Sequence, residues 1–199
     1  MTTRHTRTTS PTATFPPRPR RRARSVVAGG PVAVLLLTAL ATGCSSLSGP
    51  ATSESAFREH LRHTEQAGED AVRKLGIDPD AVIDDRRMAN ASCKDDFGAD
   101  PEGVTRDRPT VTWAPDFASH AAYAAAVDTL REEWSGQDLT VRDIPAPKQG
   151  EPGAGLPGVR TTTDRGIELS LRPDWYTGEP TLTADGGCVR HQGYLTDWE

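Results

Sequence analysis

The feature that most constrains this 199-residue chain is an apolar segment, residues 26–42 (VVAGGPVAVLLLTALAT), between an arginine-rich start and Cys44. Residues 1–25 are rich in Thr, Pro and Arg and cannot supply a hydrophobic core. A basic segment, an apolar segment and a run of small residues are typical of a secretory signal. An uncleaved transmembrane helix is the alternative, although the run is at the lower limit for spanning a bilayer and Gly29-Gly30-Pro31 interrupts it. Both interpretations remove residues 1–43 from the fold and export the rest.

Charge is divided unevenly between residues 1–43 and the rest of the chain. Residues 1–43 hold seven arginines and no acidic residue. Without those seven, the chain's 23 basic residues fall to 16 against 28 acidic ones, which leaves the exported part with a formal charge of −12. Such a surface repels phosphate groups, which supply most non-specific affinity for nucleic acid. A nucleic-acid partner is therefore excluded.

Residues 40–44 (LATGC) resemble the lipobox of bacterial lipoprotein signals, in which a small residue precedes an obligate cysteine. The resemblance implies cleavage before Cys44 and attachment of a lipid such as palmitate to its thiol. Residues 44–54 have the Ser-, Gly- and Thr-rich composition of a flexible tether. RRARSVV partly resembles a twin-arginine signal, so the export route stays open. The chain thus resembles the small secreted lipoproteins of high-GC Gram-positive (actinobacterial) bacteria, which implies lipid anchoring at the extracytoplasmic face of the cell membrane.

The cysteine count agrees with this resemblance. Three cysteines are an odd number for an exported chain. If Cys44 carries lipid, Cys93 and Cys188 remain to pair in an oxidising compartment. A metal site and a redox-active pair are alternatives, but the chain has no C-x-x-C motif and no close cysteine spacing. We predict a structural disulfide, worth roughly 4 to 5 kcal/mol because it closes a loop of about 95 residues.

Hydrophobic periodicity predicts two helices. The first spans residues 54–74; the second has Ser119 as its N-cap and Gly136 as its stop. Their apolar positions are Phe57, Leu61, Ala71, Val72 and Leu75 in the first, and Tyr123, Val127, Leu130 and Trp134 in the second.

Alternating and β-branched runs predict the strands. They fall within residues 81–93, 108–115, 139–144, a hairpin over 159–175 that turns at Asp164-Arg165-Gly166, and a last strand over 181–190 interrupted at Gly186-Gly187. The buried face of the hairpin is expected to carry Ile167, Leu169 and Leu171. We expect a single α+β domain over 55–199, with an antiparallel sheet of about four to six strands and two helices packed on one face.

Two sequence features suggest a cofactor or metal site but lack what such a site requires. GAGLPG at 153–158 satisfies G-x-G-x-x-G, but it follows a Pro-rich loop and runs into a strand, so no cofactor is expected. His60 and His63 lie three apart on the first helix and would need another ligand to hold zinc. A solvated helix face is the favoured interpretation.

An acidic segment raises a calcium alternative. The carboxylates gather around Gly98 and are Asp95, Asp96, Asp100 and Glu102. Calcium prefers such ligands, but the spacing lacks the pattern of a known calcium loop. An acidic surface loop is favoured over a calcium-dependent adhesive module.

For catalysis the sequence offers no G-x-S-x-G motif and no free thiol once the cysteines are assigned.

Trp175 and Tyr176 lie in a loop between strands, where they either cap the core or contact a glycan or protein. Trp113 and Trp134 are assigned to the core. We favour a monomeric, non-catalytic binding module of the cell envelope; the alternative is an envelope hydrolase whose site is assembled from dispersed Asp, Glu and His.

Overall fold

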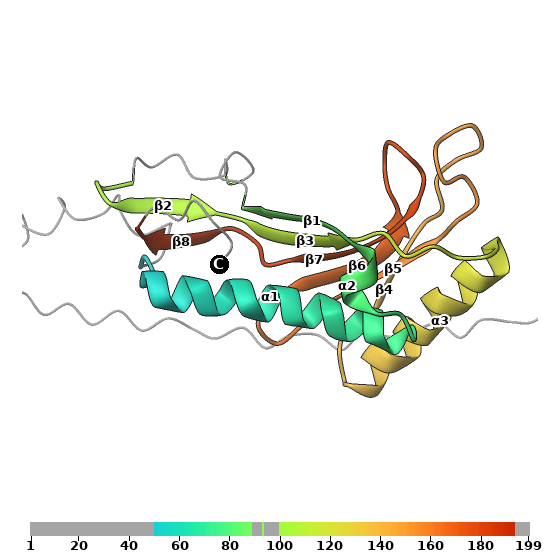
Figure 1. Cartoon of the computed structure of the whole chain (residues 1–199), viewed down its shortest axis with the longest axis horizontal. Helices are drawn as coiled ribbons and strands as arrows, with labels where there is room; N and C mark the ends of the chain where they lie inside the picture. The colour runs from blue at the N-terminus through green and yellow to red at the C-terminus, as the bar shows by residue number, and fades with distance from the viewer. Residues whose placement is uncertain (1–49, 89–92, 94–99, 194–199) are drawn as a thin grey trace, which may run out of the picture. The chain divides into compact units, whose positions relative to one another are not determined.

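The computed structural model describes residues 50–88, 93 and 100–193 (Figure 1). Its helices are α1 (Glu54–Lys74), α2 (Pro79–Val82) and α3 (His120–Gly136). Its strands are β1 (Ile83–Met88), β2 (Val104–Asp107), β3 (Pro109–Trp113), β4 (Arg142–Ile144), β5 (Gly158–Thr162), β6 (Glu168–Pro173), β7 (Pro180–Asp185) and β8 (Val189–Gln192). The predicted α+β class with an antiparallel sheet is confirmed.

Six strands form one antiparallel sheet in the order β1-β3-β7-β6-β5-β4, and β2 pairs with β8 in a separate two-stranded ribbon. Only Arg108 separates β2 from β3, and residues 186–188 separate β7 from β8. The ribbon therefore continues the β3–β7 pair beyond the sheet, alongside the first half of α1 (Figure 1).

The predicted interruption at Gly186-Gly187 is confirmed, but the expectation of one last strand is wrong. The chain leaves β7 there and begins β8 in the other sheet. A side chain at Gly186 would put its Cβ 2.6 Å from Thr64 Oγ1 and 2.7 Å from Pro109 Cγ, and Gly187 has a φ of +68°. The switch between sheets thus requires a close backbone approach followed by a left-handed residue.

Helix α1 has the predicted bounds and packs against β3, β7 and β8. The Ser53 side chain caps it by accepting from the backbone N of Ala56 at 3.2 Å. Phe57 and Leu61 are buried at predicted positions, and Gly68 lets the helix approach the sheet.

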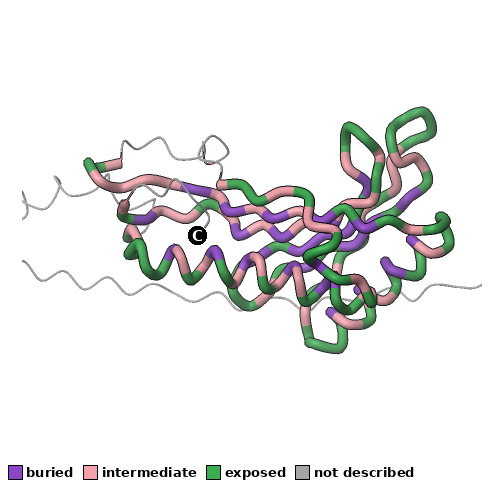
Figure 2. Tube along the Cα trace, viewed as in Figure 1, coloured by how far each residue is buried: buried purple, intermediate pink, exposed green. Residues whose placement is uncertain are grey.

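Helix α3 begins after Ser119, whose side chain accepts from the Ala122 backbone N at 3.1 Å, and ends at Gly136, as predicted. It packs against β5 and α1, so both long helices cover the same face of the sheet (Figure 1). Figure 2 shows the buried positions concentrated between the helices and this face. Trp113 and Trp134 lie in this core, as expected, with Val111, Val159, Ile167, Leu169, Leu171, Leu182 and Ala184.

Two elements escaped the sequence prediction, namely α2 and β2. β1 lies within the predicted strand region but ends at Met88; residues 89–92 lie outside the described part of the chain.

No helix in the described ranges is long and apolar enough to cross a membrane. The apolar segment 26–42 and Cys44 lie outside those ranges, so neither the signal nor the lipid site is described.

We predict that Gly68→Ala destabilises the fold by about 1–3 kcal/mol, because overpacking a core has that effect. The new Cβ would lie 2.1 Å from the Trp113 ring and 3.0 Å from Ala184 Cβ. Urea denaturation measures the change. Gly136→Ala is the matched control, since its Cβ would meet nothing within 4 Å, and it should be neutral or slightly stabilising. Equal midpoints for the two variants would contradict the packing described here.

Candidate functional site

Two loops project from the same end of the six-stranded sheet (Figure 1). Residues 145–157 join β4 to β5, and residues 174–179 join β6 to β7. Because the neighbouring strands β4, β5, β6 and β7 alternate in direction, the first and third connections fall at one end of the sheet and the β5–β6 turn at the other. This topology brings together segments that are far apart in sequence.

The two loops enclose a cleft of about 230 Å³, large enough for one ring-sized group. Most of its walls are apolar, with a few polar side chains at the margin, as is usual for small-molecule sites. The apolar residues are Ile144, Pro145, Pro147, Pro152, Pro173 and Trp175, and the polar ones are Glu151, Arg172 and Asp174.

A contact between two glycines holds the loops together. Gly153 and Gly178 have φ values of +70° and +76°. A Cβ on Gly178 would lie 2.3 Å from the backbone N of Gly153, and a Cβ on Gly153 would lie 2.3 Å from Pro173 Cβ. Gly153 is the first glycine of the G-x-G-x-x-G pattern, so this packing accounts for it without a cofactor.

The 174–179 loop is fixed by Asp174. Its Oδ1 accepts from the backbone N of Tyr176 at 2.8 Å and of Thr177 at 2.9 Å. These backbone hydrogen bonds, the one from Thr177 foremost, hold the pKa of Asp174 below its usual value. The carboxylate is therefore charged at neutral pH and keeps the turn that carries Trp175.

The 145–157 loop is fixed from inside the domain. The buried Tyr123 of α3 donates its hydroxyl to the carbonyl of Pro157 at 2.7 Å, and burial raises the pKa of Tyr123 to about 12. Leu156 is buried, and the Glu151 carboxylate accepts from the backbone N of Lys148 at 2.7 Å. Both walls of the cleft are thus preformed.

The aromatic pair predicted as a contact site is exposed. Trp175 is 73% exposed and lines the cleft, and Tyr176 is 85% exposed beside it. They are the large hydrophobic side chains that the described ranges leave exposed. Of the two interpretations, capping the core is therefore wrong, because neither ring is covered.

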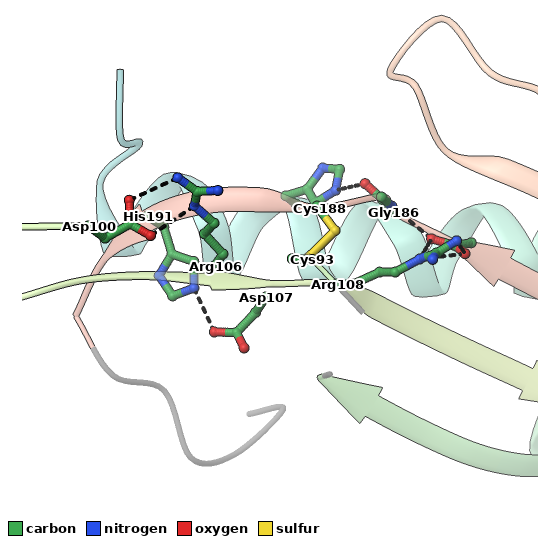
Figure 3. The surroundings of a disulfide bond; sticks show 11 residues. Cys93, Asp100, Arg106, Asp107, Arg108, Gly186, Cys188 and His191 are labelled. Atoms are coloured by element: carbon green, nitrogen blue, oxygen red, sulfur yellow. Dashed lines mark hydrogen bonds and ion pairs between the residues drawn. A yellow bond between two sulfur atoms is a disulfide. The ribbon is translucent and has the colours of Figure 1, made fainter. Parts of the chain in front are cut away.

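Cys93 and Cys188 form the predicted disulfide, with their Cα atoms 5.6 Å apart (Figure 3). It ties the segment after β1 to the start of β8. Arg106 and Arg108 lie on either side of it in Figure 3, the first paired with Asp100 and the second with Asp185. Cys188 lies beyond the end of β7 that is opposite to the 174–179 loop, so the disulfide does not border the cleft.

The residues of the calcium alternative are only partly described. Asp95 and Asp96 lie outside the described ranges, Glu102 is exposed, and Asp100 is paired with Arg190 at 2.7 Å and with Arg106 at 2.8 Å. Burial raises the pKa of Asp100, but the hydrogen bonds from the two arginines outweigh it and hold that pKa below its usual value. Within residues 50–88, 93 and 100–193 no group of three or more His, Cys, Asp or Glu could hold a metal ion.

The histidines of α1 serve separate contacts. His60 donates from Nε2 to the carbonyl of Gly186 at 2.9 Å. His63 lies 3.8 Å from Glu59 on its own helix. They converge on no common point, and the exposed His120 opens α3 elsewhere.

Sequence reasoning missed one buried pair, His191 and Asp107. His191 Nε2 lies 2.9 Å from Asp107 Oδ2, and its ring stacks on Phe57 with centroids 3.7 Å apart. The two partners are 84 positions apart, and β2 was not predicted, so no local pattern indicated the pair. A histidine–carboxylate pair is the type of group that the hydrolase alternative requires, but His191 is fully buried and cannot reach a substrate. It joins β8 to β2 and α1.

We predict that Gly178→Ala opens the contact between the two loops, whereas Gly155→Ala does not. Both glycines have positive φ, which an alanine adopts at a cost of about 1–2 kcal/mol. At Gly178 the Cβ would also strike the backbone of Gly153, while at Gly155 it would meet nothing within 4 Å. Gly178→Ala should therefore lose more unfolding free energy in urea and alter acrylamide quenching of tryptophan emission. Indistinguishable variants would show that the loops do not depend on this contact.

Comparison with protein-family models, with curated proteins and with solved structures finds no match to this chain. The functional conclusion therefore depends on the residues of the cleft and on the sequence that precedes the fold.

Proposed function

We propose that this protein is a membrane-tethered lipoprotein of the extracytoplasmic face that acts as a non-catalytic binding module, with the cleft at Trp175 as its ligand site. The apolar segment 26–42 and the lipobox-like residues ending at Cys44 support the tether. The Cys93–Cys188 disulfide supports an oxidising compartment.

The position of the cleft within the domain supports a site that faces away from the membrane. The described fold begins beside β8, where Thr52 donates its backbone N to the Arg190 carbonyl and accepts from the Gln192 backbone N, both at 2.9 Å. From Gln192 the chain runs back through β8 and β7 to Pro180, which borders the 174–179 loop. At about 3.3 Å per residue the ten strand residues of this path alone span about 33 Å. The predicted tether thus joins the domain at the end opposite the cleft.

One observation carries the proposal of binding, namely the exposure of Trp175 over a preformed apolar cleft. Largely exposed aromatic side chains such as Trp175 forgo the free energy of burial, and they are enriched where a partner covers them. The loops beneath Trp175 are held by Asp174, by Tyr123 and by the glycine contact, so a ligand would meet an ordered site.

The tether is tested by Cys44→Ser in the full chain. We expect this variant to leave the membrane fraction, because the thiol that would carry lipid is gone. Ser45→Ala is the neighbouring control and should stay membrane-bound. Retention of Cys44→Ser in the membrane fraction would favour an uncleaved helix over a lipid anchor.

Binding is tested by placing a photoreactive amino acid at Tyr176 and irradiating intact cells. We expect a covalent adduct that falls about tenfold or more in the Trp175→Ala background, the loss typical of an aromatic anchor. Trp175 is exposed, so its removal should leave the urea midpoint unchanged.

The control carries the same photoreactive residue at Arg62, an exposed position of α1 remote from the cleft, and should give no adduct. An adduct of equal yield at Arg62, or one that is insensitive to Trp175→Ala, would contradict a ligand site at the cleft.

A further inference from the structure

The polar groups of the cleft differ in whether they are free to bind a ligand. Glu151 accepts from the backbone of Lys148, and Asp174 accepts from the backbone of Tyr176 and Thr177. The side chain of Arg172, in contrast, is exposed and has no hydrogen bond or ion pair with any residue in the ranges 50–88, 93 and 100–193. A guanidinium carries five N–H donors, so Arg172 is the charged side chain of the cleft lining that can donate to a ligand.

Strand register places two more arginines on the same face as Arg172. Arg142 of β4 lies opposite Arg160 of β5, and Arg160 lies opposite Ser170 of β6. Arg172 follows Ser170 by two positions and therefore shares its face. We call Arg142, Arg160 and Arg172 the arginine row.

The arginine row lies on the sheet face that the helices leave open. Leu169 and Leu171, which alternate with Ser170 and Arg172, are buried on the helix side. Asp143, the neighbour of Arg142, is paired with Arg131 of α3 on that same side. The helices therefore do not cover the guanidinium groups of the row.

The positive charges of the arginine row have few acidic partners. Arg142 has no ion-pair partner among the residues that the structure describes, and Arg160 approaches only Glu168, at 3.9 Å. Like charges placed directly opposite each other destabilise a sheet. An anionic ligand would relieve this repulsion, and guanidinium binds carboxylates through two parallel hydrogen bonds.

The walls of the cleft add a second requirement. Trp175 and the prolines offer apolar surface for one ring, and Arg172 in the same lining favours an anion attached to that ring. A pyranose that bears a carboxylate satisfies both, because its C–H face is apolar and its substituents point outward. A neutral sugar would offer Arg172 only hydroxyl and ring oxygens, whose hydrogen bonds to a guanidinium are weaker than those of a carboxylate.

We propose that the Trp175 cleft binds an acidic saccharide, with one sugar ring against the indole, its carboxylate on Arg172, and the following acidic sugars along Arg160 and Arg142. This inference rests on the proposed binding function and names its ligand class. The formal charge of −12 on the exported part disfavours a long polyanion such as nucleic acid, which would pass close to many acidic residues, whereas a short acidic saccharide would lie mainly against the arginine row, because charges beyond about 8 Å are screened at physiological salt.

Calorimetric titration of the full chain in detergent with tri-galacturonate and with its methyl ester tests the proposal. The two probes differ in charge but share the ring and its C–H face. We expect the acid to bind and the ester to bind about tenfold or more weakly. Arg172→Gln should weaken the acid by about the same factor and leave the ester unchanged.

Arg62→Gln removes one guanidinium from an exposed position of α1 remote from the cleft and is the matched control, which should leave the affinity for the acid unchanged. Equal affinity for acid and ester, or equal losses in Arg172→Gln and Arg62→Gln, would overturn the acidic ligand. Absence of binding by either probe would overturn it too. If the Trp175-dependent adduct at Tyr176 nevertheless persists in cells, the binding function stands; if that adduct is also absent, both fail.

Discussion

The rest of the fold depends on the junction at Gly186, where the β3–β7 pair of the six-stranded sheet ends and the β2–β8 ribbon begins. There Gly186 donates its backbone N to the carbonyl of Pro109 and accepts from His60, both at 2.9 Å. The Arg108–Asp185 ion pair lies beside this point, and Cys188 follows within two residues. These contacts let β7 leave the six-stranded sheet and continue as β8, which gives the domain a ribbon end and a loop end.

The sequence allowed most regular elements to be predicted because their signals are local. Ser53 and Ser119 cap their helices with their own side chains, and the hairpin turns at Gly166 with apolar residues on alternate positions. β2 has no such signal, since its stability comes from pairing with β8, which follows about 80 residues later. Its partner could only be found in three dimensions.

Only the part of the candidate site that has a local sequence signal could be predicted. Trp175 and Tyr176 were notable in the sequence because large aromatics in a loop require an explanation. The opposite wall, residues 145–152, reaches them only through the close approach of Gly153 to Gly178. The arginine row depends on register across three strands, and no spacing along the chain reveals it.

The way in which Thr52 joins the fold has a mechanical consequence. Thr52 bridges to β8 in parallel, through hydrogen bonds to residues on both sides of His191. A pull on the chain from its N-terminal side therefore loads these bonds along the strand and passes into β8. From there the covalent link from Cys188 to Cys93 and the pairing with β2 share the tension. The opposing force would come from a ligand held in the cleft, so the load would run along β7 and β8 between the loops and Thr52.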